Sequence, residues 1–137
     1  MSTEIRKALY QKLTATNAVT SKLSDTTAIY HGQAPPDADY PFIIFNKQSN
    51  VRTRAFGKST AFEAESWLIK AVDRNTTSNP AEAISEAVDA ALTNGTLTVT
   101  GGTVEDIYPT GDVDFLEVDQ GQTYRHHGVI YRIVTTD

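Results

Sequence analysis

Gly57-Lys58-Ser59 resembles the second half of a phosphate-binding loop, and it is the one stretch of this sequence that suggests a nucleotide site. The complete loop needs another glycine five residues before Gly57, because glycine lets several backbone N–H groups curl around a phosphate. Arg52 stands at that position. The loop must also lead into a helix, whereas the sequence that follows, STAFEAESWLIKAV, predicts a strand. The pattern therefore disfavours nucleotide binding.

His126 and His127, with His31 as a third ligand, raise the possibility of a metal site. Adjacent residues of a strand point to opposite faces, so this pair does not readily close on one ion. Zinc also needs further defined ligands, and the chain has no cysteine and no helical H-x-x-x-H pair. We expect no metal and no cofactor.

The acidic run DVDFLEVDQGQT, residues 112–123, resembles a calcium loop only superficially. Its sixth position is Glu117 and its twelfth is Thr123, where the loop requires glycine and glutamate. A strained G-x-S-x-G turn for a serine nucleophile is also missing from the sequence. No catalytic residue is expected, and the chain is predicted not to be an enzyme.

The length and composition of the chain limit the class of protein to which it can belong. The chain has 137 residues, enough for one domain over residues 1–137 with a sizeable core. The absence of cysteine fits a reducing cytoplasm, and no apolar run approaches the length that spans a bilayer. We therefore expect no membrane contact.

The net charge of −5 is unevenly distributed along the chain. Residues 1–74 hold ten Lys or Arg against seven acids, whereas no Lys or Arg occurs between Arg74 and Arg125. A protein that grips nucleic acid without sequence specificity is usually basic overall. Two interpretations stay open: a solvated acidic surface, or complementary patches that meet between copies.

Two helices frame the predicted sheet. Ser2 is expected to cap the first, in which Ile5, Ala8, Leu9 and Leu13 share one face. Asn79 is expected to cap the second, with Pro80 and Glu82 in its first turn. Strands are predicted at 28–32, 42–48, 60–72, 96–100, 103–109 and 122–135, with an acidic loop at 110–121. The order predicts an α+β fold with a mostly antiparallel sheet and both helices on one face.

Residues 49–59 are expected to form the tip of a long protruding hairpin, because the strand from 60 to 72 is far longer than usual. We interpret this tip as a contact arm that orders against an acidic partner. The acidic segment 105–119 of a neighbouring copy is one candidate partner, and DNA is another. The predicted protein-interface residues are Arg52, Arg54, Phe56, Lys58, Asp112, Asp114 and Glu117.

The chain resembles the tail-completion (tail-terminator, tail-to-head joining) proteins of long-tailed bacteriophages. The resemblance rests on the order of short motifs: Ile29-Tyr30, Ala34-Pro35, Tyr40-Pro41-Phe42 and the closing strand from Arg125 to Ile133. It covers nearly the whole chain. The resemblance implies a non-enzymatic structural virion protein that forms a six-fold ring, a hexamer, at the head-proximal end of the tail.

In that role the ring ends tail-tube polymerisation and joins the tail to the head. The implied partners are other copies of the chain, the major tail-tube protein and the head connector or stopper protein. DNA would pass through the ring without sequence-specific binding. The implied location is the virion tail, after assembly in the host cytoplasm.

Three alternatives stay open at this point. The first is another neck, head-completion or minor tail protein of similar size. The second is a small metal- or nucleotide-dependent enzyme built on residues 52–60 or on His126 and His127. The third is a small-ligand module that uses the sheet face with Trp67 and Tyr131.

Overall fold

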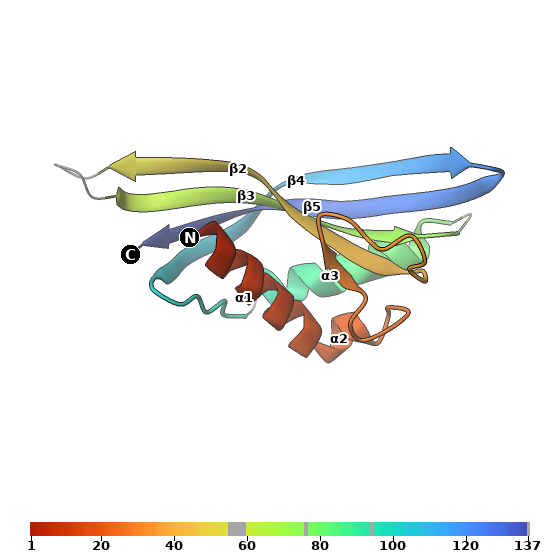
Figure 1. Cartoon of the computed structure of the whole chain (residues 1–137), viewed down its shortest axis with the longest axis horizontal. Coiled ribbons are helices and arrows are strands. Elements are labelled where there is room, and N and C mark those ends of the chain that lie inside the picture. Colours follow the sequence, from red (N-terminus) through yellow and green to blue (C-terminus); the bar gives the residue numbers. More distant parts are fainter. Residues whose placement is uncertain (55–59, 76, 94, 137) are drawn as a thin grey trace.

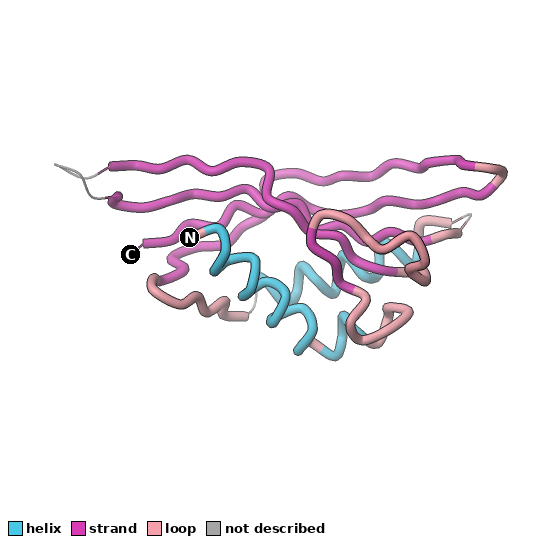
Figure 2. Tube along the Cα trace, viewed as in Figure 1, coloured by secondary structure: helices cyan, strands magenta, loops and turns pink. Residues whose placement is uncertain are grey.

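The computed structural model has a five-stranded sheet with three helices packed against one of its faces (Figure 1). The structure describes residues 1–54, 60–75, 77–93 and 95–136. No helix within these residues has the length and apolar character needed to cross a membrane. The predicted α+β class with helices on one face is confirmed (Figure 2).

The strand order in the sheet is β1-β2-β3-β5-β4. β1 pairs in parallel with β2, and all other neighbours are antiparallel, as the sequence predicted. The elements are α1 (Ser2–Ala15), α2 (Asn17–Thr20), β1 (Ile29–His31), β2 (Phe42–Arg54), β3 (Thr60–Asp73), α3 (Asn79–Thr93), β4 (Thr103–Asp119) and β5 (Gln122–Thr136).

The main core lies between the helices and the sheet. Leu9 of α1 and Ile84 of α3 pack there with Trp67 of β3 and Tyr131 of β5, all nearly inaccessible to solvent. Tyr131 keeps its hydroxyl satisfied by donating a 2.8 Å hydrogen bond to Asp89 Oδ1 of α3. This bond ties α3 to the middle of the sheet, because a buried hydroxyl is costly without a partner.

The opposite, helix-free face of the sheet is partly covered at one end by the loop of residues 32–41. A smaller buried cluster forms there from Ala28, Phe42 and Val72, with Tyr40 and Ile44 packed against it. The remainder of this face is open, and its described side chains include Phe62, Lys70, Phe115 and His126.

The acidic segment at 110–121, predicted as a loop, is mostly strand. β4 pairs with β5 from Thr103–Thr136 to Asp119–Gln122, and only Gln120 and Gly121 form the turn. Both turn residues have positive φ, 50° and 78°. The loop prediction was wrong because β4 is an edge strand with little apolar alternation, so its structure comes from pairing with β5 and not from a buried face.

Three further local predictions need correction. Residues 49–54 continue β2 and do not belong to the hairpin tip. Ser2 lies inside α1, where Met1 is the N-cap, and its hydroxyl bonds Glu65 instead of the helix backbone. Residues 96–100 belong to no strand, although Leu97 and Val99 pack against the core.

Candidate protein interface

Two long hairpins extend from opposite ends of the sheet (Figure 1). The first consists of residues 49–54 of β2 and 60–65 of β3, and we call it the arm. The second consists of residues 112–119 of β4 and 122–128 of β5, and we call it the acidic hairpin. Because the ladder between β3 and β5 runs from Glu63–Thr135 to Asp73–Arg125, the arm and the acidic hairpin lie far apart in one copy.

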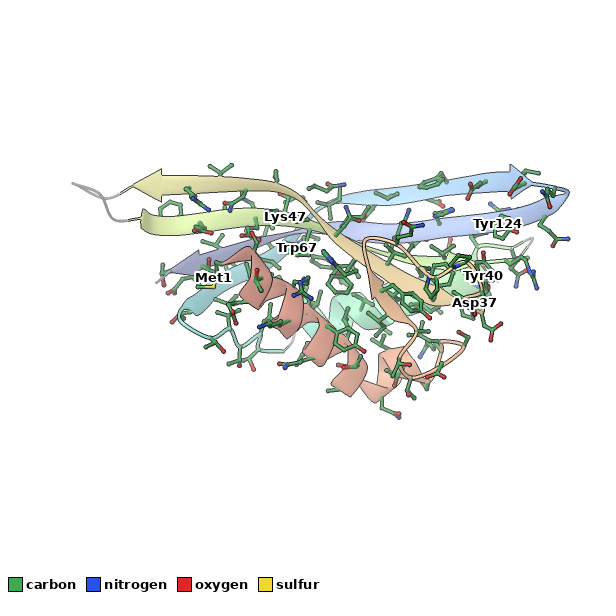
Figure 3. The ribbon with its side chains drawn as sticks, in the orientation of Figure 1. Met1, Asp37, Tyr40, Lys47, Trp67 and Tyr124 are labelled. Atoms are coloured by element: carbon green, nitrogen blue, oxygen red, sulfur yellow. The ribbon has the colours of Figure 1, made fainter. Side chains whose placement is uncertain are left out.

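The base of the arm is held by a buried carboxylate. Glu65 is fully buried and accepts hydrogen bonds from Trp67 Nε1 at 2.9 Å, Ser2 Oγ at 2.8 Å and Asn50 Nδ2 at 3.3 Å. Lys47 Nζ in turn donates to Ser2 Oγ at 2.9 Å. Lys47 and Trp67 accordingly lie near the start of α1 in Figure 3. This network fixes the direction in which the arm leaves the sheet, since each member needs the others for hydrogen-bond satisfaction.

The outer arm exposes one arginine and two apolar side chains. Arg52 Nε lies 3.4 Å from Glu63 Oε1, yet 65% of the Arg52 side chain is exposed. Val51 and Phe62, on the helix-free face of the arm, are 52% and 41% exposed. Of the other predicted residues, Arg54 ends β2, and Phe56 and Lys58 lie outside the described residues.

The predicted acidic residues are placed on both faces of the acidic hairpin. Asp114 pairs across the ladder with His127, on the helix side, and its Oδ1 lies 3.7 Å from His127 Nδ1. Asp112 shares that side, opposite Val129. Glu117 points to the helix-free face, where its Oε1 lies 3.1 Å from His126 Nε2. The structure therefore separates Glu117 from the two aspartates.

A pocket of about 250 Å³ lies on the helix-free face beside Glu117, and we call it the aromatic pocket. It is lined by Tyr40, Phe42, Ile44, Val72, Glu117, Asp119, Tyr124 and His126. The ring centroids of Tyr40 and Tyr124 are 5.5 Å apart, and both residues lie at the end of the molecule away from the arm (Figure 3). The aromatic pocket thus joins the loop of residues 32–41 to the acidic hairpin.

Cations and an imidazole border this pocket. His126 stacks on Phe115 with a centroid distance of 4.3 Å, and Lys70 Nζ lies 5.3 Å from the same ring. Burial lowers the pKa of His126, against an opposing contribution from the Glu117 hydrogen bond. Burial also lowers the pKa of Lys70 and raises the pKa of Tyr40. His126 is therefore neutral near pH 7. The carboxylates of Glu117 and Asp119 share the border of the pocket with two cations, Lys70 and Arg74. Arg74 Cζ lies 5.6 Å from the centre of the Tyr40 ring.

The two histidines behave as the strand periodicity predicted. His126 faces the helix-free side and His127 faces the helix side, so they do not converge on one point. Within the described ranges no three His, Asp or Glu side chains are arranged to hold a metal ion. The surface features of the described residues are the exposed Arg52, Val51 and Phe62 of the arm, and an aromatic pocket bordered by charges of both signs.

Sequence reasoning missed the aromatic pocket. Its residues come from the loop before β2, from β2 and β3, and from the acidic hairpin, which are distant in sequence. The signal available was the density of aromatic residues in Tyr40-Pro41-Phe42 and around Tyr124. Without the β4–β5 pairing, nothing in the sequence brings Glu117 and Asp119 to those rings.

Known proteins share this architecture. A family model described as "Tail completion protein gp17" matches residues 7–136. A chain of the virion of a native gene transfer agent (GTA) particle superimposes with a TM-score of 0.77 at 18% identity, covering 99% of this chain and 97% of that chain. The gp17 protein of bacteriophage SPP1 gives a TM-score of 0.57 at 18% identity, covering 99% of this chain and 90% of its own. No curated protein matches.

At these identities the two solved structures establish the shared fold, and the family model carries the assignment. It spans nearly the whole chain and agrees with the resemblance found in the motifs from Ile29 to Ile133. The chain belongs to the tail completion protein gp17 family, whose members are structural proteins of phage tails.

Proposed function

We propose that copies of this chain form a hexameric ring at the head-proximal end of a phage tail. The ring ends polymerisation of the major tail-tube protein and offers its other side to the head connector or stopper protein. The protein works by shape and charge and catalyses no reaction. It is assembled in the host cytoplasm and remains in the virion.

One observation carries this proposal. The arm, which exposes Arg52, and the acidic hairpin lie at opposite ends of the same sheet (Figure 1). A surface whose complement lies at the other end of the molecule favours head-to-tail contacts, which close into a ring when the rotation between copies allows it. Predicted interface residues Arg52 and Arg54 belong to one end, and Asp112, Asp114 and Glu117 belong to the other.

The overall charge supports passage of DNA through such a ring. The net charge is −5, and a net negative protein does not gain affinity from neutralising phosphates. DNA therefore slides through the ring without sequence-specific binding. The same reasoning favours protein partners over DNA for the arm, whose cations are few and partly paired, as Arg52 is with Glu63.

The test is an early stop codon in the gene for this chain, introduced into the genome of the phage or gene-transfer particle that encodes it. We expect electron micrographs to show tails of abnormal length that are not joined to DNA-filled heads. Supplying the wild-type chain from a plasmid restores normal particles. A synonymous change at the same codon serves as the matched control.

Two results would contradict the proposal. Tails of normal length that fail to join heads indicate a neck or head-completion protein instead. Normal particles that lack the chain altogether show that it has no structural part in the tail. Immunogold labelling of wild-type particles must also place the protein at the junction of head and tail.

A further inference from the structure

We propose that the arm of one copy and the acidic hairpin of the next copy join edge to edge, so that β2 of one and β4 of the other form an antiparallel strand pair. The inference rests on the proposed function for the premise that copies meet head-to-tail. It adds which backbone edges meet and in which register. The partner of the arm is thus a second copy of this chain.

The outer edge of β2 is unpaired over most of its length. In the part of the chain that the structure describes, β1 pairs only with residues 43–45 of β2, while β3 occupies the other edge. Residues 46–54 therefore carry unpaired backbone N–H and C=O groups along the outer edge, and the side chains of Val51, Arg52 and Thr53 are exposed. An unpaired edge of this kind is a template for a further strand.

β4 offers the matching edge at the other end of the sheet. It is the last strand in the order β1-β2-β3-β5-β4, so no described strand covers its outer side. Bulges and proline block strand addition, and on β4 they lie before Gly111, from which the ladder with β5 runs regularly to Asp119. The arm is likewise regular from Ser49 to Thr53. These two regular stretches are the edges suited to pairing.

The two edges of one copy do not meet each other. By the ladder registers, Arg52 is level with Glu63 of β3. Asp114 is level with His127 of β5, and hence with Ala71 of β3. These levels are eight residues apart along β3, about 26 Å, and the two edges lie on opposite sides of the sheet. The contact is consequently between copies and head-to-tail.

Charge selects the arm and the acidic hairpin as partners over two like edges. Arg52 keeps 65% of its side chain exposed beside Glu63, and a surface ion pair of this kind is weak enough to be shared. β4 contains no Lys or Arg, and its regular stretch carries Asp112, Asp114, Glu117 and Asp119. Two arms would bring arginines together and two hairpins would bring carboxylates together, which cross-strand pairing disfavours. The arm paired with the hairpin places opposite charges together.

One register satisfies both faces of such a pair. Arg52 and Asp114 lie on the helix side of their strands, whereas Val51 and Phe115 lie on the helix-free side. In an antiparallel pair with Arg52 opposite Asp114, Val51 lies opposite Phe115. All four side chains are about half exposed or more in the single copy, at 65%, 59%, 52% and 46% in that order. A slip of one residue places Arg52 opposite Phe115 and breaks both matches.

The test uses a chain that has no cysteine. In this register Thr53 lies opposite Val113. Thr53→Cys with Val113→Cys therefore places two thiols within reach of a disulfide, whose Cβ atoms approach to about 4 Å. Particles carrying both substitutions are treated with a mild oxidant and run on a denaturing gel without reductant. We expect a ladder of disulfide-linked oligomers that collapses to the single chain when reductant is added.

The matched control carries Thr53→Cys and Leu116→Cys. Leu116 is 50% exposed and lies three residues from Val113, on the opposite face of the same strand, so this pair should give no ladder. Equal ladders from both pairs, or no ladder from the first pair in particles that contain the protein, overturn the edge pairing while the tail role stands. Particles that assemble normally without the protein show instead that the proposed function has failed.

A charge exchange tests the same register independently. Arg52→Asp or Asp114→Arg alone should reduce the yield of head-joined tails by about fivefold or more, because each places like charges opposite one another. The double variant restores opposite charges and should recover most of that yield. Arg52→Asp with Asp119→Arg restores the net charge at another position of β4 and should not recover it. Equal yields from the two double variants, with circular dichroism showing folded chains, would overturn the pairing of Arg52 with Asp114.

Discussion

Trp67 Nε1 donates a 2.9 Å hydrogen bond to Glu65 Oε1, two residues earlier on the same face of β3. Trp67 is 1% exposed and Glu65 is fully buried. A buried carboxylate persists only where its oxygens are well supplied with donors. Glu65 meets this condition because Ser2 and Asn50 bring further donors from α1 and β2. The pair therefore marks where helix, sheet and arm are joined.

Replacing Glu65 by leucine should destabilise the chain by about 3 kcal/mol, because the buried donor of Trp67 and the part-buried donors of Ser2 and Asn50 lose their acceptor. Glu65→Gln keeps one carbonyl acceptor for Trp67 and should cost about 1 kcal/mol. Urea unfolding followed by the fluorescence of Trp67, the only tryptophan, measures both. The exposed Glu86→Gln on α3 is the control and should change stability by less than about 0.5 kcal/mol. Equal stability of Glu65→Leu and wild type would refute the role of the network.

Gly128 is required by the close approach of β3 to β5. A Cβ at this position would overlap the carbonyl oxygen of Ile69 and the backbone of Lys70. Gly128→Ala should therefore destabilise the chain by about 2 kcal/mol or more, since backbone atoms cannot move aside cheaply. Gly111→Ala on β4 is the matched control. A Cβ there meets nothing within 4 Å, and its φ lies outside the left-handed region. The control should be neutral or slightly stabilising. The melting temperatures of both variants test this prediction. An equal change in melting temperature in the two variants would contradict the steric argument.

Much of the fold could be predicted from the sequence where a buried face makes apolar residues recur at a regular spacing. The α1 positions Ile5, Ala8, Leu9 and Leu13 are all buried, as their helical spacing predicted. β3 runs from Thr60 to Asp73, close to the predicted 60–72. α3 begins at Asn79, and Ser78 Oγ bonds Glu82 Oε1 at 2.9 Å, so the capping interaction lies one residue before the prediction. Helical spacing, strand length and capping residues depend on neighbouring residues in the sequence, so they can be predicted without knowing the fold.

The candidate site was harder to predict from the sequence, because it depends on pairing between segments that are distant in the chain. The sequence placed Arg52 and Arg54 in the tip of a protruding hairpin, whereas the structure places both on β2. It did not divide Asp112 and Asp114 from Glu117, because the segment was predicted as a loop, and only the alternation of a strand places the two aspartates on the face opposite Glu117. The aromatic pocket likewise arises only when β4 lies beside β5. Its edge position gives β4 no hydrophobic alternation that a sequence pattern could detect.

The two-residue turn of the acidic hairpin offers a stabilising substitution. Gln120 and Gly121 both have positive φ, the conformation of a type I′ turn, in which asparagine followed by glycine is preferred. Gln120→Asn should raise the melting temperature by about 2 °C, because asparagine tolerates positive φ better. Gly121→Ala should lower it by a larger amount, since an L side chain is strained at φ 78°. Differential scanning calorimetry checks both. A lower melting temperature for Gln120→Asn would show that the turn conformation does not limit stability.

Protonation of His126 should weaken the folded state below neutral pH. Burial against Phe115 is the main cause that lowers its folded pKa, Lys70 adds to it, and the Glu117 hydrogen bond opposes it. The unfolded chain then binds the proton more readily than the folded chain. The free energy of unfolding should therefore fall as pH drops below the ordinary histidine value of 6.5, until the folded pKa is passed.

Urea midpoints at about pH 7.5 and about pH 5.5 measure this fall. His126→Gln keeps a hydrogen-bonding side chain but cannot titrate, so it should lose less stability over this interval than wild type. Burial also lowers the pKa of His31, with Arg6 adding to the effect, so His31→Gln should reduce the fall as well. The double variant should show the smallest dependence. If His126→Gln retains the full wild-type fall while His31→Gln removes it, the acid sensitivity belongs to β1 and not to the aromatic pocket.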